Sequence, residues 1–119
     1  MAAEKQFENK VKKYLAERND WYLKYWGGGG FTKSGVPDLI VCDKGCFMGI
    51  EVKADSGSPS LLQLEHLSMV RSAGGYGILL YPKDFELFKE FNEHKTVRNA
   101  WYVSNIEEQQ RWKIKLEGD

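Results

Sequence analysis

The sequence predicts one α/β domain with a mixed central β-sheet flanked by helices, in the order α-β-β-β-α-β-α. A length of 119 residues is suited to a single domain. Hydrophobic residues make up 42% of the chain and aromatic residues 13%, which suffices for a packed core and excludes a disordered chain. Segments with helical spacing of apolar residues alternate with short segments rich in β-forming residues, and this pattern is typical of a sheet covered by helices.

The first elements are a helix, a strand and a glycine-rich loop. Residues 4–18 repeat apolar side chains at helical spacing and predict an amphipathic helix. Residues 21–26 are rich in β-forming aromatic residues and predict a strand. Four consecutive glycines follow, so we expect residues 27–35 to form a loop.

The middle of the chain predicts a strand pair and a capped helix. Residues 37–43 and 46–54 are expected to form two strands joined by a turn at Lys44 and Gly45. After a loop, Ser60 is placed to cap a helix over residues 61–73.

The last elements are a buried strand over residues 76–81 and a helix over residues 82–93 that begins at a proline. A short strand is expected at residues 101–104 in the tail.

Charge balance, hydropathy and cysteine content exclude several classes of protein. Lys and Arg total 17, as do Asp and Glu, so bulk charge cannot drive nucleic-acid binding, although a local basic face remains open. The N-terminal segment is polar and no apolar run approaches the roughly 20 residues that span a bilayer. Cys42 and Cys46 form neither a secreted disulfide framework nor a zinc-ligand pattern. We therefore expect a cytoplasmic protein. A bacterial or phage origin is a separate expectation that composition does not test.

The predicted hairpin brings two carboxylates together. With a two-residue turn, Asp43 faces Cys46, and the same register places Asp38 opposite Glu51. Directly opposed Cβ atoms lie about 4.5–5.5 Å apart, so the two carboxylates repel each other unless a cation lies between them. Another turn type would shift this register.

The two faces of the second hairpin strand differ in character. Lys53 follows Glu51 by two residues and shares its face, whereas Met48, Ile50 and Val52 form an apolar row on the other. Gly49 is expected to leave the acidic face open to a substrate backbone. A lysine beside a metal site can orient or activate water. The same Glu-x-Lys pattern is also typical of an exposed strand face with a weak ion pair.

These residues resemble a known nuclease signature. The segments 35–41 (GVPDLIV) and 49–54 (GIEVKA) are similar to the PD-(D/E)xK nuclease motif, and most closely to the small stand-alone VRR-NUC branch of that superfamily. Gln63, near the start of the following helix, and an acidic residue on the first helix also match. The resemblance covers residues 4–81 and implies a restriction-endonuclease-like core.

The resemblance implies a role for each matching residue. Asp38, Glu51 and the backbone carbonyl of Val52 would bind Mg²⁺ or Mn²⁺, and Lys53 would orient the attacking water. Glu8 would be the first-helix acid, with Glu4 as the competing candidate. Gln63 would hydrogen-bond near the water or the scissile phosphate, or be an ordinary residue of the first helical turn.

Other residues are candidates for contact with nucleic acid. Basic and hydroxyl side chains near the expected site are suited to DNA phosphates: Lys12, Lys24, Lys33 and Ser34. Each is equally typical of an exposed surface. Aromatic residues in the first strand are divided between core packing and stacking on bases or a subunit contact: Trp21, Tyr22, Tyr25 and Trp26. The two histidines, His66 and His94, are isolated.

The leading hypothesis is a DNA endonuclease that depends on Mg²⁺ or Mn²⁺, and the resemblance implies products with a 3′-hydroxyl and a 5′-phosphate. Cutting two strands needs two sites, which favours a homodimer. The resemblance implies Holliday-junction or other branched DNA as the substrate. The alternatives are a sequence-specific restriction-type enzyme and a non-catalytic module that binds nucleic acid or protein.

Overall fold

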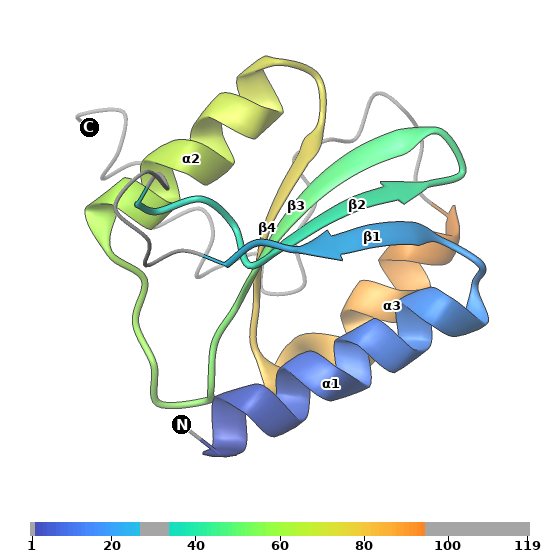
Figure 1. Ribbon diagram of the computed structural model, residues 1–119, viewed down its shortest axis with the longest axis horizontal. Helices are drawn as coiled ribbons and strands as arrows, with labels where there is room; N and C mark the ends of the chain where they lie inside the picture. Colours follow the sequence, from blue (N-terminus) through green and yellow to red (C-terminus); the bar gives the residue numbers. More distant parts are fainter. Residues whose placement is uncertain (1, 27–33, 95–119) are drawn as a thin grey trace.

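The computed structural model describes residues 2–26 and 34–94. These form three layers, with one β-sheet in the middle and helices on both of its faces. The elements are α1 (Ala2–Glu17), β1 (Trp21–Lys24), β2 (Leu39–Asp43), β3 (Cys46–Val52), α2 (Leu61–Ser72), β4 (Tyr76–Leu80), a 3₁₀ turn (Pro82–Asp84) and α3 (Phe85–His94). Helix α2 covers one face of the sheet, and α1 and α3 cover the other (Figure 1). The predicted α/β class, mixed sheet and element order are confirmed.

The sheet has the strand order β1-β2-β3-β4. The first three strands are antiparallel neighbours, and β4 runs parallel to β3 after the crossover through α2. Parallel strands need such a crossover, because no tight turn can join them.

The hairpin register is the predicted one. Asp43 pairs with Cys46, and the ladder continues to Leu39 and Ile50. Lys44 and Gly45 both have positive φ, at 50° and 85°, as a two-residue type I′ turn requires. Regular pairing ends one residue before Asp38 and Glu51. There the Asp38 Oδ2 atom accepts a hydrogen bond from the Val52 N–H at 2.8 Å, so a side chain replaces the strand's backbone acceptor.

Most element boundaries differ from the prediction by one or two residues. β1 ends at Lys24, although the Tyr25 N–H still donates to the Asp38 carbonyl at 2.8 Å. Pro82 begins a 3₁₀ turn rather than the final helix, which starts at Phe85. Ser60 caps α2 as expected. Residues 27–33, which hold the four glycines and Lys33, and the strand expected at residues 101–104 lie outside the described residues.

The two faces of the sheet bury separate apolar clusters. The larger packs Phe7, Val11 and Leu15 of α1 and Phe88 and Phe91 of α3 against the sheet, including the predicted row Met48, Ile50 and Val52. The smaller joins Leu64 and Leu67 of α2 to Leu79 and Tyr81.

The expectation that Gly49 leaves its face open is wrong. Gly49 is buried, and a Cβ atom there would lie 3.0 Å from Pro37 Cγ and 3.6 Å from a methyl group of Val70. The glycine admits close packing of these side chains and is not a substrate channel.

Candidate active site

The candidate site lies where β2 begins and where β1 and β3 end (Figure 1). Asp38 directly precedes β2, and Glu51 is the penultimate residue of β3. Because the two strands are antiparallel, the start of one and the end of the other meet at the same end of the sheet. Local pairing therefore brings the two carboxylates together, as the sequence predicts.

Asp38 is held by the backbone and remains accessible. Its Oδ2 atom accepts the Val52 N–H, and its Oδ1 atom lies 3.7 Å from the Lys24 ammonium. The side chain is 21% exposed. The Oδ2 atom is thus fixed to the end of β3, while the Oδ1 atom lies near the Lys24 ammonium.

Glu51 is a buried acid with an incomplete set of partners. Its side chain is 2% exposed, and its Oε2 atom accepts a hydrogen bond from Gln63 Nε2 at 2.9 Å. Its Oε1 atom has no hydrogen-bond partner within residues 2–26 and 34–94. Burial and the negative charge of Asp38 raise the pKa of Glu51 to about 9. Such a group is stabilised as a carboxylate when a cation binds beside it.

Gln63 is oriented by the helix cap. Its Oε1 atom accepts the Ser60 N–H at 2.8 Å, and its own N–H donates to the Ser60 hydroxyl at 3.1 Å. This capping box uses the amide oxygen and leaves the Nε2 group to donate to Glu51. The residue therefore both caps α2 and contacts the acidic pair.

Lys53 also joins the pair. Its Nζ atom lies 3.7 Å from Glu51 Oε2, and its side chain is 14% exposed. The Lys53 N–H donates to the Leu80 carbonyl at 3.0 Å. This hydrogen bond extends the contact between β3 and β4 and fixes the backbone of Lys53. Asp38, Glu51, Lys53 and Gln63 thus form one connected group.

Glu8 reaches this group from α1 through a lysine. Its side chain is 4% exposed, with Lys24 Nζ 2.7 Å from Oε1 and Lys12 Nζ 3.1 Å from Oε2. Burial alone would raise the pKa of Glu8, but hydrogen bonds from Lys24 and Lys12 outweigh burial and lower it. Glu4, the competing candidate, is only half-buried.

Lys24 occupies an unexpected place. It was expected at the surface as a DNA-phosphate contact, but its ammonium lies between Glu8 and Asp38, at 2.7 Å and 3.7 Å. The signal for this lies in the strand's alternation: Tyr22 packs against the α1 face, and Lys24 follows it by two residues. Lys12 also pairs with Glu8, and Ser34 is exposed.

The donor set suits a hard cation. Asp38, the unpartnered Glu51 Oε1 atom and the Val52 carbonyl are oxygen donors, and Mg²⁺ accepts one or two carboxylates while keeping several waters. Among the described residues, no three Asp, Glu, His or Cys side chains form a complete metal cage. A cation here would be bound by two carboxylates and the Val52 carbonyl, with water completing its shell.

The remaining candidates lie elsewhere or do not contact the site. His66 and Cys46 line a cavity of about 600 Å³ between α2 and the start of β3, at the other end of that strand. Cys42 and Cys46 are free thiols. Trp21 and Trp26 are 61% and 68% exposed, whereas Tyr22 packs on the core. The side chain of His94 lies outside what is described.

Comparisons with known proteins add no family. No family model matches the chain, and no curated protein or solved structure is significantly similar to it. Within residues 2–26 and 34–94, no helix has the length and apolar character needed to cross a bilayer.

Proposed function

We propose that this chain is a divalent-metal-dependent DNA endonuclease with a restriction-endonuclease-like core of the VRR-NUC type. The observation that carries the proposal is the convergence of Asp38 and Glu51 at one end of the sheet, with Lys53 Nζ 3.7 Å from Glu51. Burying Glu51 with one oxygen unpartnered and beside a second carboxylate costs stability, and a cation bound between the two carboxylates would offset that cost.

Each residue of the group has a role in phosphodiester hydrolysis. Asp38, Glu51 and the Val52 carbonyl would hold the cation, which would acidify water and offset charge on the phosphate. Lys53 would donate a hydrogen bond from Nζ to orient the attacking water. Gln63, held by the helix cap, would keep the Glu51 carboxylate aligned. Glu8 would act on the site through Lys24.

The proposed substrate is branched DNA, such as a four-way junction, cut by a homodimer. The described part of the chain presents one such group of residues, whereas symmetric cutting of two strands needs two. Sedimentation or light scattering of the purified chain tests this part of the proposal, and a strictly monomeric species bound to a cut junction would contradict it.

The decisive experiment is a cleavage assay on single-stranded, duplex, flap and four-way DNA with Mg²⁺ or Mn²⁺. We expect cutting that EDTA abolishes. Asp38→Ala, Glu51→Gln and Lys53→Met should each reduce the rate by at least about 100-fold, the loss typical of a positioned catalytic group. Asp55→Asn is the matched control, because it removes an exposed carboxylate from the loop after β3 and should cut normally.

Calorimetry separates this proposal from a non-catalytic binding module. The wild-type chain should bind Mn²⁺, and Asp38→Ala should not. Undiminished cutting by the folded Asp38→Ala variant would refute the assignment. DNA binding without metal binding or cutting would favour the module instead.

A further inference from the structure

Trp26 is an exposed indole beside the acidic group. Its side chain is 68% exposed, which is more than that of any other large hydrophobic residue described. It lies two residues after Lys24, the last residue of β1. Exposing so much apolar surface forgoes the stabilisation that burial of an indole provides, so the core does not explain this position.

The ammonium groups of two lysines lie over the Trp26 ring, which we call the Trp26 platform. The Nζ atoms of Lys5, from α1, and of Lys24 each lie 5.5 Å from the centre of the Trp26 ring. Ammonium groups at this distance interact with the ring electrostatically. The indole is thereby held next to two positive charges instead of being free at the end of a strand.

Lys24 ties the Trp26 platform to the candidate active site. The same ammonium that contacts the Trp26 ring lies 2.7 Å from Glu8 Oε1 and 3.7 Å from Asp38 Oδ1. One side chain therefore spans from the indole to a proposed metal ligand. A nucleotide whose base lies on the ring would have its phosphate close to both lysines and near Asp38.

We propose that Trp26, Lys5 and Lys24 form a stacking subsite for an unpaired nucleobase, next to the phosphate that is cut. This inference rests on the proposed nuclease function and extends it to one feature of the substrate. A base inside a continuous duplex is stacked on both sides and cannot lie on the indole, so the subsite accepts bases at flaps, junctions or single strands. Base–aromatic stacking tolerates any sequence, because every base has a π-face.

The test compares binding of two labelled DNAs by fluorescence anisotropy, in EDTA to prevent cutting. One is a blunt duplex, and the other is the same duplex with a single-stranded 5′ flap. The variants are Trp26→Ala, Trp26→Tyr, which keeps an aromatic ring, and Trp21→Ala. Trp21 is the matched control, because it is a similarly exposed tryptophan (61%) at the other end of β1.

We expect Trp26→Ala to weaken binding of the flap DNA by about 5-fold or more, the effect typical of removing one stacked base contact. Its affinity for the blunt duplex should change by less than about 2-fold. Trp26→Tyr should retain most of the flap affinity, and Trp21→Ala should behave as wild type on both DNAs. Circular dichroism confirms that each variant is folded.

The outcomes separate this inference from the proposed function. Equal loss on both DNAs, no loss on either, or the same loss from Trp21→Ala overturns the stacking subsite. If the wild-type chain cuts DNA with Mg²⁺ while Trp26→Ala binds the flap normally, only the subsite fails. If the wild-type chain neither binds nor cuts any of the DNAs, both the subsite and the nuclease proposal fail.

Discussion

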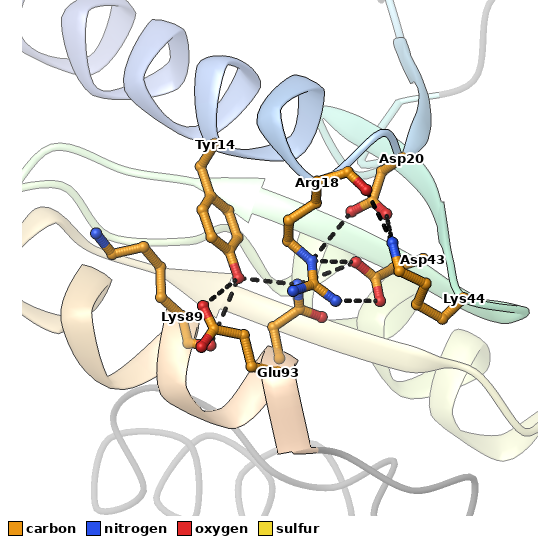
Figure 2. Close-up of polar contacts among 8 residues, drawn as sticks. Tyr14, Arg18, Asp20, Asp43, Lys44, Lys89 and Glu93 are labelled. Carbon is orange, nitrogen blue, oxygen red and sulfur yellow. Dashed lines mark hydrogen bonds and ion pairs between the residues drawn. The ribbon is translucent and has the colours of Figure 1, made fainter.

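Each end of the β2–β3 ribbon brings two carboxylates together, but the surroundings of the two pairs differ. At the turn, Asp43 lies beside Asp20, and both side chains are fully buried (Figure 2). At the open end, Asp38 lies beside Glu51. At both ends, repulsion between neighbouring carboxylates lowers the stability of the fold.

At the turn end Asp43 is held by rigid partners, whereas Asp20 has ion pairs with Arg18 and Lys44 and no hydrogen bond to either oxygen within the described residues. Arg18 donates from Nε and Nη2 to the two oxygens of Asp43, at 2.7 Å and 3.0 Å. Asn92 of α3 donates to the same carboxylate at 3.2 Å, and the Lys44 ammonium lies 3.5 Å from Asp20 (Figure 2). A planar guanidinium in this geometry binds a carboxylate strongly and fixes its position. This end joins α1, the hairpin and α3, and is built for stability.

The open end has no bidentate partner among the described residues. Lys24 and Lys53 each lie 3.7 Å from a carboxylate oxygen, and the Oε1 atom of Glu51 has no hydrogen-bond partner within the described residues. Ammonium groups on flexible stems can move aside, as a bidentate guanidinium cannot. The contrast supports the proposal that the two acidic pairs serve different purposes, with Asp43 holding the fold and the Asp38–Glu51 pair available to a cation.

The largest expected effect comes from opening the turn end. Arg18→Met removes the main counter-ion of two buried carboxylates and should cost about 3 kcal/mol of stability. Urea denaturation in EDTA measures it. The matched change at the open end, Lys24→Met, should cost clearly less, because Lys12 still neutralises Glu8. Equal losses from the two variants would remove the distinction between the ends.

A smaller effect of opposite sign is expected at the open end. Glu51→Gln replaces a buried acid with a neutral amide that can still accept from Gln63 and donate to Asp38. In EDTA this variant should be more stable than wild type by about 1–2 kcal/mol, while losing metal-dependent cutting. A Glu51→Gln variant that unfolds at lower urea than wild type would show that Glu51 serves stability.

The smallest effect is a pH dependence at the turn end. Burial and the neighbouring Asp43 raise the pKa of Asp20 to about 6. Because this value is above that of an unfolded Asp, ionisation of Asp20 disfavours the fold, and stability from this group falls as pH rises from about 4 to 6. Asp20→Asn should therefore be about 1 kcal/mol more stable than wild type at pH 8 and no more stable at pH 4.

Urea curves of the Asp20→Asn and wild-type chains at both pH values test this prediction. Subtracting the free energies of unfolding of the two chains removes the contribution of the carboxylates that both chains carry. A constant difference across the range would mean that the Lys44 and Arg18 charges hold Asp20 ionised at all these pH values.

Local features of the sequence were sufficient for the element order and the hairpin register. The register follows from a two-residue turn at Lys44 and Gly45 and from the two-residue alternation of strands, which together bring Asp38 to Glu51. The capping role of Ser60 is equally local, since its partner Gln63 is three residues away. Such features depend on neighbouring residues and can be predicted without knowing the rest of the fold.

Contacts between distant residues were decided only by the tertiary structure. Lys24 lies beside Glu8, 16 positions away, and Asn92 beside Asp43, 49 positions away, because helices pack on the sheet at particular places. The same packing covers Gly49 and leaves Trp26 exposed next to Lys5. Burial and charge at each carboxylate are set by these long-range neighbours, so the difference between the two ends of the ribbon appears only in the folded chain.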